Sequence, residues 1–333
     1  MTSPLAETIV GDHASIVALR DLVLRVARSR ASTVLIYGET GTGKGLVARA
    51  LHDHSSRAEK GFTEINCAAI PGNLLESELF GHERGAFTGA VTRKEGLLEI
   101  AHGGSVFLDE VRELDPMMQA KILTLLDSRR FRRIGGVREL SSDVRFIAAT
   151  NKILLGEVNA GKFRDDLYYR LQVVSINLPP LRERGDDVFV LAERFLARFN
   201  RTHASGFKRI DPGVEQAFRR YAWPGNVREL GNLLERICIL ESGDTVGLEH
   251  LPARIVRGAP ITEAGGYAER TSRFQRDMIE TALAAAGGHA GRAAESLGLS
   301  RHALRHQMAK LGLAASASPA EAAAAGLHRR EPP

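Results

Sequence analysis

The sequence predicts an α/β fold in which helices cover both faces of a parallel sheet, followed by a small helical lid subdomain and a short all-α domain. Two observations support this. Four runs of strand length, three of them mostly apolar, alternate with segments of helical periodicity, as is typical of a parallel sheet. These runs span residues 33–37, 62–66, 104–108 and 144–149. After Pro179 and Pro180 the apolar pattern is helical throughout, so we expect the sheet to end there.

The 333 residues are enough for about two domains with separate cores. We expect the α/β core over residues 1–180 and the helical lid over residues 181–250. Residues 251–272 are rich in Gly, Pro, Glu and Thr, which indicates a linker, and residues 273–313 would form the all-α domain. Residues 314–333 are biased towards Ala, Ser and Pro without an aromatic residue, which predicts a disordered tail.

Helices are expected after each strand and throughout the later part of the chain. Asp115 can cap and Pro116 can begin a helix after the third strand, because proline is tolerated at the first helical position. A hairpin is expected around Gly135 and Gly136. The other expected helices span residues 46–52, 72–80, 188–201, 212–222, 227–241, 273–286, 292–297 and 301–311.

The composition is that of a soluble globular protein, with 44% hydrophobic and 26% charged residues and a formal net charge of +5. No apolar run approaches the roughly 20 residues that a membrane span needs, so we expect a cytoplasmic protein with no membrane partner. Cys67 and Cys238 stand alone, without the spacing of a zinc site or disulfide framework, and are expected to be buried free thiols.

Residues 38–45 form a glycine-rich turn between the first strand and the next helix. They are Gly38, Glu39, Thr40, Gly41, Thr42, Gly43, Lys44 and Gly45. Glycines let backbone N–H groups face an anion, the helix N-terminus favours negative charge, and Lys44 can reach terminal phosphates. The turn therefore predicts a phosphate-binding site. Position 45 lacks the usual Ser or Thr, and a glycine-rich turn with a surface lysine is the alternative on this pattern alone.

Polar residues follow the third and fourth strands. Asp109 and Glu110 end the third strand, where a nucleotide site in an α/β fold collects further groups. Asp109 can hold Mg²⁺, directly or through water, and its neighbour can polarise an attacking water. Asn151 follows the fourth strand and could orient that water. Arg164 and Arg170 share one helical segment and could stabilise transition-state charge from a neighbouring subunit, or could be solvated partners of nearby aspartates.

Residues 85–90, GAFTGA, are the most distinctive hexapeptide in the chain. Glycines bracket Phe87 and Thr88 among polar neighbours, which predicts a protruding loop that docks on a partner, or a turn that buries Phe87. Near the C-terminus, seven basic and three acidic residues lie between Arg270 and Leu313, which favours a polyanionic partner. A short helix, a glycine turn and a second helix predict a helix-turn-helix, or a structural three-helix cap. Its expected DNA-binding residues are Ser300, Arg301, His302, Arg305 and His306.

Together these residues resemble the bacterial enhancer-binding proteins, AAA+ P-loop ATPases that activate the sigma-54 form of RNA polymerase. The resemblance covers about residues 8–313, and GAFTGA is its most specific mark. It implies Walker A at Lys44 and Walker B at Asp109 and Glu110. It also implies a Fis-type helix-turn-helix, ATP and Mg²⁺ as cofactors, and sigma-54 holoenzyme and enhancer DNA as partners. A homo-oligomer, most simply a hexamer, would remodel the closed promoter complex.

The resemblance assigns further roles. Asn66 becomes the switch partner of Glu110, Asn151 sensor I, and Arg228 sensor II, a nucleotide-contacting residue. Arg164 and Arg170 become trans-acting fingers, while Phe87 and Thr88 contact the sigma factor. The hairpin over residues 129–138 would be a second, supporting loop.

Four departures from the family pattern limit these assignments. Gly45 replaces the usual glutamate, and Arg112 replaces a usual glycine. Ala303 replaces a polar residue often found in recognition helices. About eight residues precede the matching region, so control is expected from a protein acting in trans, from expression level, or not at all. Two other functions remain open: a DNA-binding regulator whose nucleotide site is only a switch, and an AAA+ enzyme of DNA replication or repair.

Overall fold

The structure is a computed structural model that describes residues 5–257, 276, 279–283, 286, 289–297, 299–310 and 313. The chain divides into two compact units, Met1–Pro260 and Ile261–Pro333. The expected tail, most of the expected linker and half of the helix expected over residues 273–286 lie outside the described residues. Each unit is therefore described by itself.

A parallel sheet of five strands organises the first unit. Its strand order is β2-β5-β8-β1-β9. The strands are β1 (Thr33–Tyr37), β2 (Phe62–Asn66), β5 (Ser105–Asp109), β8 (Arg145–Thr150) and β9 (Ser175–Asn177). The four predicted strands are confirmed, two of them shifted by one residue, and β9 was not predicted. Asp109 is thus the last residue of β5 rather than the residue after it.

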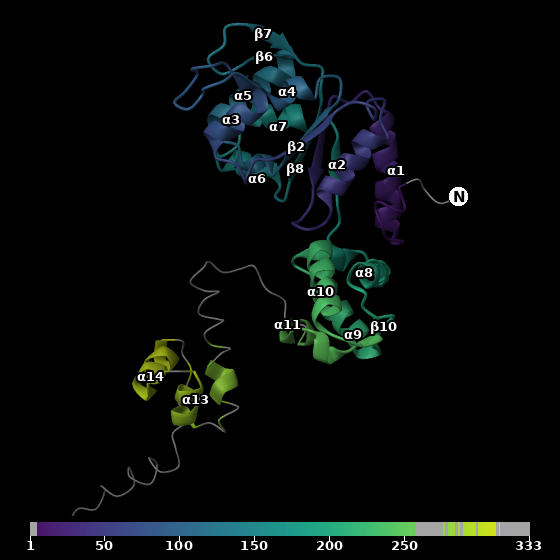
Figure 1. Cartoon of the computed structure of the whole chain (residues 1–333), viewed down its shortest axis with the longest axis vertical. Coiled ribbons are helices and arrows are strands. Elements are labelled where there is room, and N and C mark those ends of the chain that lie inside the picture. The colour runs from purple at the N-terminus through teal and green to yellow at the C-terminus, as the bar shows by residue number, and fades with distance from the viewer. Residues whose placement is uncertain are drawn as a thin grey trace, which may run out of the picture. The chain divides into compact units, whose positions relative to one another are not determined.

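Helices cover both faces of this sheet, as predicted (Figure 1). Neighbouring side chains of β1 enter different cores: Leu35 packs into one cluster, while Val34 and Ile36 pack into the other. This follows from the two-residue period of a strand and explains why its sequence is apolar throughout. One face carries α1 (Ala14–Arg28) and α2 (Lys44–Asp53). The other carries α3 (Gly72–Phe80), α4 (Leu97–Ile100), α5 (Pro116–Ser128), α6 (Leu154–Asn159) and α7 (Asp165–Leu171).

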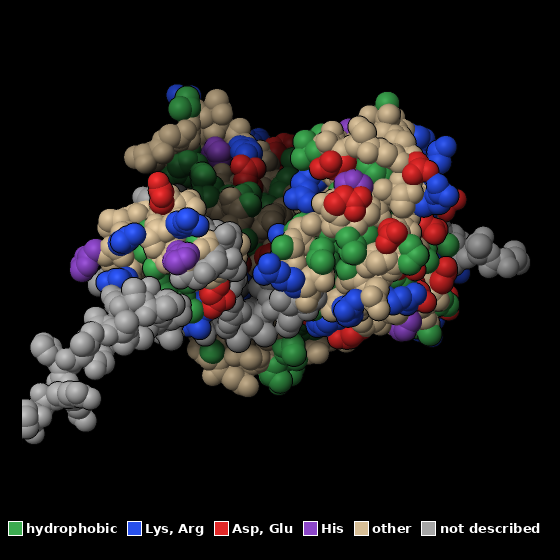
Figure 2. All heavy atoms as spheres, turned by 90° about the horizontal axis from the view of Figure 1, so that it is seen from below, with side chains coloured by type: hydrophobic (Ala, Val, Ile, Leu, Met, Phe, Trp, Pro, Cys, Tyr) green, Lys and Arg blue, Asp and Glu red, His purple; other side chains and the backbone are tan. Residues whose placement is uncertain are grey.

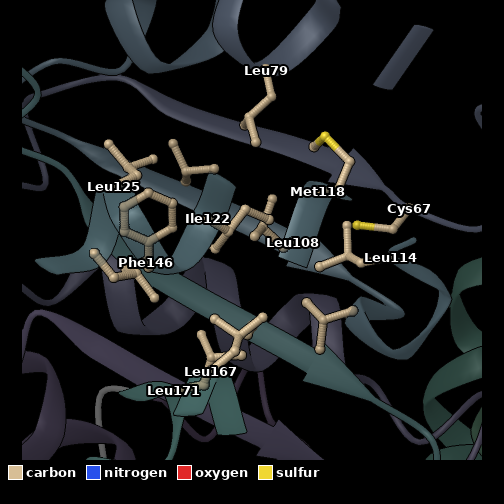
Figure 3. Packing of buried hydrophobic residues seen from close by; sticks show 14 of the residues in the cluster. Cys67, Leu79, Leu108, Leu114, Met118, Ile122, Leu125, Phe146, Leu167 and Leu171 are labelled. Carbon is tan, nitrogen blue, oxygen red and sulfur yellow. The ribbon is translucent and has the colours of Figure 1, made fainter. Parts of the chain in front are cut away.

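The cluster that contains Leu35 is drawn in Figure 3, where Leu108 and Phe146 of the sheet face Met118, Ile122 and Leu125 of α5. The helix begins as predicted, because Asp115 accepts a hydrogen bond from the Met118 N–H at 2.8 Å and Pro116 follows it. Cys67 belongs to the same cluster and is a buried free thiol, as is Cys238 in the lid.

Two short antiparallel pairs lie beside the sheet. β3 (Gly81–His82) pairs with β4 (Lys94–Glu95) and so brackets residues 85–90. β6 (Arg130–Arg132) pairs with β7 (Glu139–Ser141), which confirms the hairpin expected around Gly135 and Gly136. A parallel bridge between His82 and Ile134 joins the two pairs. The 85–90 loop and the hairpin are therefore neighbours.

The lid is helical, as predicted. Its helices are α8 (Asp187–His203), α9 (Pro212–Arg220), α10 (Asn226–Leu240) and α11 (Ala253–Val256), with a short parallel pair of β10 (Arg209–Ile210) and β11 (Thr245–Val246). The lid also contains two single-turn 3-10 helices, η2 (Leu181–Glu183) and η3 (Leu248–His250). A third, η1 (Val111–Glu113), follows β5 in the α/β core. Trp223 and Phe218, both buried, meet edge to face with ring centroids 5.1 Å apart at the centre of the lid core.

In the second unit, α13 (Ala290–Ser296) and α14 (Arg301–Lys310) share a small core. Its buried members are Ile279, Ala293, Ala294, Leu304 and Met308.

On the face of the molecule drawn in Figure 2, acidic and basic side chains are interspersed, consistent with the small net charge of the chain. Among the described helices, none combines the length and apolar character of a membrane span.

Candidate functional site

The glycine-rich turn lies between β1 and α2, as the sequence predicted. Gly41 and Gly43 adopt φ values of +81° and +103°, a region that favours glycine. Gly43 caps α2 without a side-chain hydrogen bond. Among the hydrogen bonds of the described residues, none uses the N–H of Gly41, Gly43 or Lys44. The turn thus presents unpaired donors at a helix N-terminus, which is the arrangement that binds phosphate.

Lys44 lies inside this turn and is only 6% exposed. Its Nζ donates to the carbonyl oxygens of Gly38 at 2.9 Å and Glu39 at 3.4 Å. The same Nζ lies 3.6 Å from Oε1 of Glu110. The ammonium group is therefore held between the turn and the end of β5, where phosphate oxygens could compete for it.

Asp109, the last residue of β5, and Glu110, which follows it, lie at the same edge of the sheet as the turn, because all five strands are parallel. Oδ1 of Asp109 accepts a hydrogen bond from the Glu110 N–H at 3.0 Å. Glu110 adopts φ 54° and ψ 50°, a left-handed conformation that costs a non-glycine residue about 1 kcal/mol. Strained backbone conformations of this kind are concentrated at functional sites. In this conformation the Glu110 carboxylate lies beside the Lys44 ammonium group.

Asn151 joins this group directly after β8. Its backbone N–H donates to Oε2 of Glu110 at 3.3 Å, and its Nδ2 makes a long contact of 3.4 Å with Oγ1 of Thr40. Its Oδ1 is buried and has no hydrogen-bond partner in the part of the chain that the structure describes. A buried amide oxygen with no partner beside a phosphate cradle could accept a hydrogen bond from a water there.

The structure does not form the Asn66–Glu110 pair that the resemblance implied. Asn66 pairs with Asp109 across β2 and β5, but its Oδ1 accepts a hydrogen bond from the Ala68 N–H at 2.9 Å. The Glu110 carboxylate is taken by Lys44 and Asn151. Asn66 is thus near the acidic pair without contacting Glu110, because its side chain closes a local turn.

Arg164 and Arg170 have acidic partners in their own chain. Arg164 donates two hydrogen bonds to Asp166, at 3.0 and 2.7 Å, which raise its pKa. Arg170 pairs with Asp127 at 3.0 Å and donates to the Leu126 carbonyl at 2.8 Å. In the described part of the chain, neither guanidinium bonds to residues 38–45. A role at the turn would therefore have to be in another subunit.

The lid supplies contacts to the turn that the sequence analysis missed. Arg182 forms two hydrogen bonds to the Glu39 carboxylate, at 2.9 and 2.6 Å, and these lower the pKa of Glu39. Asn226 and Arg184 also reach the turn. Arg228, the residue that was predicted, contributes its backbone N–H, which donates to the Gly41 carbonyl at 3.2 Å, while its side chain is exposed. Nothing in the spacing of Arg182 or Arg184 could have indicated these contacts.

A backbone hydrogen bond joins the two ends of the 85–90 loop, and the residues at its tip are exposed. The Gly85 N–H donates to the Ala90 carbonyl at 2.8 Å, and Gly85 and Gly89 both have positive φ with open space around them. Phe87 is 41% exposed and its ring meets that of His82 edge to face, with centroids 5.0 Å apart. Thr88 is exposed. The prediction of an outward loop is confirmed, and Phe87 rests on His82 instead of entering the core.

Arg133 joins the β6–β7 hairpin to the base of this loop. Only 8% exposed, it donates to Glu83 at 2.7 Å and forms two hydrogen bonds with Glu99, the longer of which is 2.8 Å. The Glu83 N–H also donates to the Ile134 carbonyl at 3.0 Å. The supporting position expected for residues 129–138 thus has a physical basis in one buried guanidinium.

In the second unit, Ser300 caps α14 as predicted, because its Oγ accepts a hydrogen bond from the Ala303 N–H at 3.1 Å. Arg301, His302 and Arg305 are exposed on this helix. The side chain of His306 lies outside the described residues. A Cβ added to Gly291 would fall 2.5 Å from the Arg301 guanidinium, so Arg301 lies close over α13.

Three families match consecutive parts of the chain. The sigma-54 interaction domain matches residues 9–177, the AAA+ ATPase lid domain residues 182–266, and the bacterial regulatory proteins of the Fis family residues 272–311.

Curated relatives match over most of the chain. Nitrogen fixation protein AnfA of Azotobacter vinelandii is 45% identical over 307 residues, covering 92% of this chain and 57% of AnfA. Transcriptional regulatory protein ZraR of Klebsiella oxytoca is 43% identical over 317 residues, covering 92% of this chain and 71% of ZraR. The chain therefore spans little more than half the length of AnfA.

Among solved structures, NtrX from Brucella abortus in complex with ATP is similar at a TM-score of 0.69 and 36% sequence identity. The match covers 91% of this chain and 69% of that chain.

Proposed function

This chain belongs to the family that carries the sigma-54 interaction domain, and from that membership we propose that it is an ATP-hydrolysing, sigma-54-dependent activator of transcription. Its fold is an AAA+ ATPase core with a lid and a Fis-type helix-turn-helix domain. The observation that carries the proposal is the convergence of Lys44, Glu110 and Asn151 on a turn with unpaired N–H groups. Its partners would place its work in the cytoplasm.

In this proposal each residue of the group has one task. The N–H groups of residues 38–45 bind phosphate oxygens, and Lys44 exchanges its carbonyl and carboxylate partners for the terminal phosphates. Once Lys44 turns to phosphate, Glu110 is freed to accept a proton from the attacking water. Asn151 orients that water through its amide oxygen, which has no hydrogen-bond partner among the described residues.

Asp109 fits a Mg²⁺ site that is completed by phosphate. In the described residues, no group of three or more acidic, His or Cys side chains could hold a metal alone. Mg²⁺ is usually bound through one or two carboxylates together with substrate phosphates and water, so a single Asp109 is sufficient. The ion would neutralise charge that develops on the phosphates. Gly45 offers no hydroxyl as a further ligand.

Arg164 and Arg170 would complete the site of a neighbouring subunit in a ring, most simply a hexamer. The support is that both arginines lie on α7 or its cap without bonding to the turn of their own chain. Mixing Lys44→Ala with Arg164→Ala subunits should restore hydrolysis above the sum of the two alone, because an intact turn and an intact finger can meet.

A control mixture distinguishes this from a general effect of mixing. Lys44→Ala with Glu110→Ala should show no gain, since both changes lie on the same side of the subunit contact. Equal behaviour of the two mixtures would contradict action in trans. Hydrolysis should also rise more than linearly with protein concentration.

The loop of residues 85–90 would carry the result of hydrolysis to the sigma factor through Phe87 and Thr88, while α14 binds enhancer DNA. The support is the exposure of both loop residues and of Arg301, His302 and Arg305. Arginines early in a recognition helix can reach guanine edges or phosphates in a major groove. A regulatory protein acting in trans would be a further partner.

An open-complex assay with sigma-54 holoenzyme, ATP and promoter DNA tests this function directly. The wild type should open the promoter, and Thr88→Ala should hydrolyse ATP without doing so. Thr92→Ala, an exposed threonine just beyond the loop, is the matched control and should keep both activities. If Thr88→Ala still opens the promoter, the role of the loop is wrong. ATP binding without turnover in the wild type would favour a nucleotide switch instead.

A further inference from the structure

Three consecutive carbonyl groups of the phosphate-binding turn receive hydrogen bonds from the lid. The Thr40 carbonyl accepts from Nδ2 of Asn226 at 3.1 Å, and the Thr42 carbonyl accepts from Arg184 at 3.2 Å. Between them, the Gly41 carbonyl accepts from a lid backbone N–H at 3.2 Å. The lid therefore contacts the backbone of the turn residue by residue.

These bonds fix the direction in which the turn presents its donors. The C=O of one residue and the N–H of the next belong to one planar trans peptide and point in opposite directions. When the carbonyls of Thr40 and Thr42 are held towards the lid, the N–H groups of Gly41 and Gly43 must point to the opposite side. Those two N–H groups are among the ones without a partner in the described structure.

Asn226 is the centre of this contact. It is completely buried and adopts φ 50°, a left-handed conformation that asparagine tolerates better than most residues. Its Oδ1 accepts from the Leu181 N–H at 2.7 Å, and its Nδ2 donates to Glu39 at 3.1 Å as well as to Thr40. One amide thus ties the start of the lid to two residues of the turn.

The lid backbone also approaches too closely for a side chain to intervene. A Cβ added to Gly41 would lie 2.1 Å from the carbonyl oxygen of Gly225. Gly41 is therefore required twice, for its positive φ and for direct contact with the lid. Arg184 is 4% exposed and bridges the Thr42 and Pro179 carbonyls, so its position is fixed as well.

We propose that Asn226 and Arg184 are positioning residues for phosphate: they hold the carbonyls of the turn outward so that its N–H groups face the nucleotide phosphates. The inference rests on the proposed nucleotide binding and adds the lid as a part of the phosphate grip. Because such coupling is reciprocal, a bound phosphate also stabilises the contact between the turn and the lid.

Two substitutions that leave the net charge unchanged test the inference. Asn226→Gly keeps the left-handed backbone and removes the amide. Arg184→Lys keeps the positive charge but replaces the planar guanidinium, whose Nε and Nη2 contact the Pro179 and Thr42 carbonyls, with a single ammonium nitrogen. Binding of ADP and of adenosine is measured by calorimetry or competition for each variant, because adenosine lacks the phosphates. We expect ADP affinity to fall about tenfold, or about 1.4 kcal/mol, in each variant, with adenosine affinity within about twofold of wild type.

Asn200→Ala is the matched control, since Asn200 also makes amide hydrogen bonds within the lid but none to the turn. It should leave the ratio of ADP to adenosine affinity unchanged. Variants that bind ADP like the wild type overturn the inference, as do variants that lose ADP and adenosine affinity in equal proportion. A wild type that binds neither ligand would instead overturn the proposed nucleotide site itself.

Discussion

Replacing Arg133 with methionine removes the guanidinium that joins the β6–β7 hairpin to the base of the 85–90 loop. Glu99, 18% exposed, would lose two charged donors and keep only the Gly96 N–H at 3.3 Å. A hydrogen bond to a charged group contributes about 1.5–3 kcal/mol, so we assign about 1.5 kcal/mol to this loss. Glu83 is 38% exposed, so the loss of its ion pair with Arg133 costs only about 0.5 kcal/mol of stability.

The free energy of unfolding should therefore fall by about 2 kcal/mol at pH 7, because methionine keeps most of the apolar stem in place. For a unit of this size the melting temperature falls by about 4–8 °C. Urea unfolding measures the difference, with Arg132→Met as the matched control. Arg132 is an exposed neighbour on β6 and its replacement should change stability by less than about 0.5 kcal/mol.

The stability difference between the wild type and Arg133→Met should shrink as the pH falls. The hydrogen bonds from Arg133 hold the pKa of Glu99 below its usual range, against the opposing effect of burial. Their stabilisation is complete above the unfolded pKa of about 4.3 and is lost as the pH falls through the lower folded value. The wild type and Arg133→Met should thus converge in acid. A difference that stays constant from pH 7 into that acid range, or that is absent at pH 7, would refute the reasoning.

Gly41→Ala and Gly43→Ala both place alanine at positive φ, at about 1 kcal/mol each. Because only position 41 meets the Gly225 oxygen, calorimetry should show a clearly lower melting temperature for Gly41→Ala, and equal losses would contradict the lid contact. Gly45→Ala meets only ordinary contacts, so a better helix former should raise stability by about 0.5–1 kcal/mol in urea unfolding, and a loss would contradict this. Burial raises the pKa of the Cys67 thiol to about 12, so iodoacetamide at pH 8 should label Cys67 far more slowly in native than in unfolded protein; equal rates would contradict its burial.

Three of the predicted strands, β1, β5 and β8, are buried on both faces, and such apolar runs need no other signal. The fourth, β2, was predicted although Ile65 alone is buried among its five residues. β9 has only Ile176 buried among its three residues, and it exists as a strand because β1 offers an edge to pair with. The two-residue strands around residues 85–90 likewise depend on tertiary contacts. Such short elements carry no periodicity that a sequence could reveal.

The candidate site divides in the same way. Lys44, Glu110 and Asn151 were predictable because each follows or begins an element with a clear pattern. Asn226 and Arg184 were not predictable, because their role depends on hydrogen bonds to Thr40 and Thr42, which lie 186 and 142 residues away in the sequence. Asn66 was expected to pair with Glu110, but strand pairing sets it beside Asp109. Its hydrogen bond with the Ala68 N–H depends on a side-chain conformation that strand pairing does not determine.

The pairing of Arg170 with Asp127 could be taken to exclude a role in catalysis, and magnitudes decide the question. The two side chains are 44% and 58% exposed, so their ion pair stabilises the chain by at most about 1 kcal/mol. An arginine that stabilises transition-state charge in phosphoryl transfer contributes a factor of about 10³ or more in kcat, which exceeds 4 kcal/mol. In the proposed ring, the transition state of a neighbouring site would therefore outcompete Asp127 for the guanidinium. Asp127→Asn should then leave the cooperative rise of hydrolysis with protein concentration intact, whereas Arg170→Ala should abolish it.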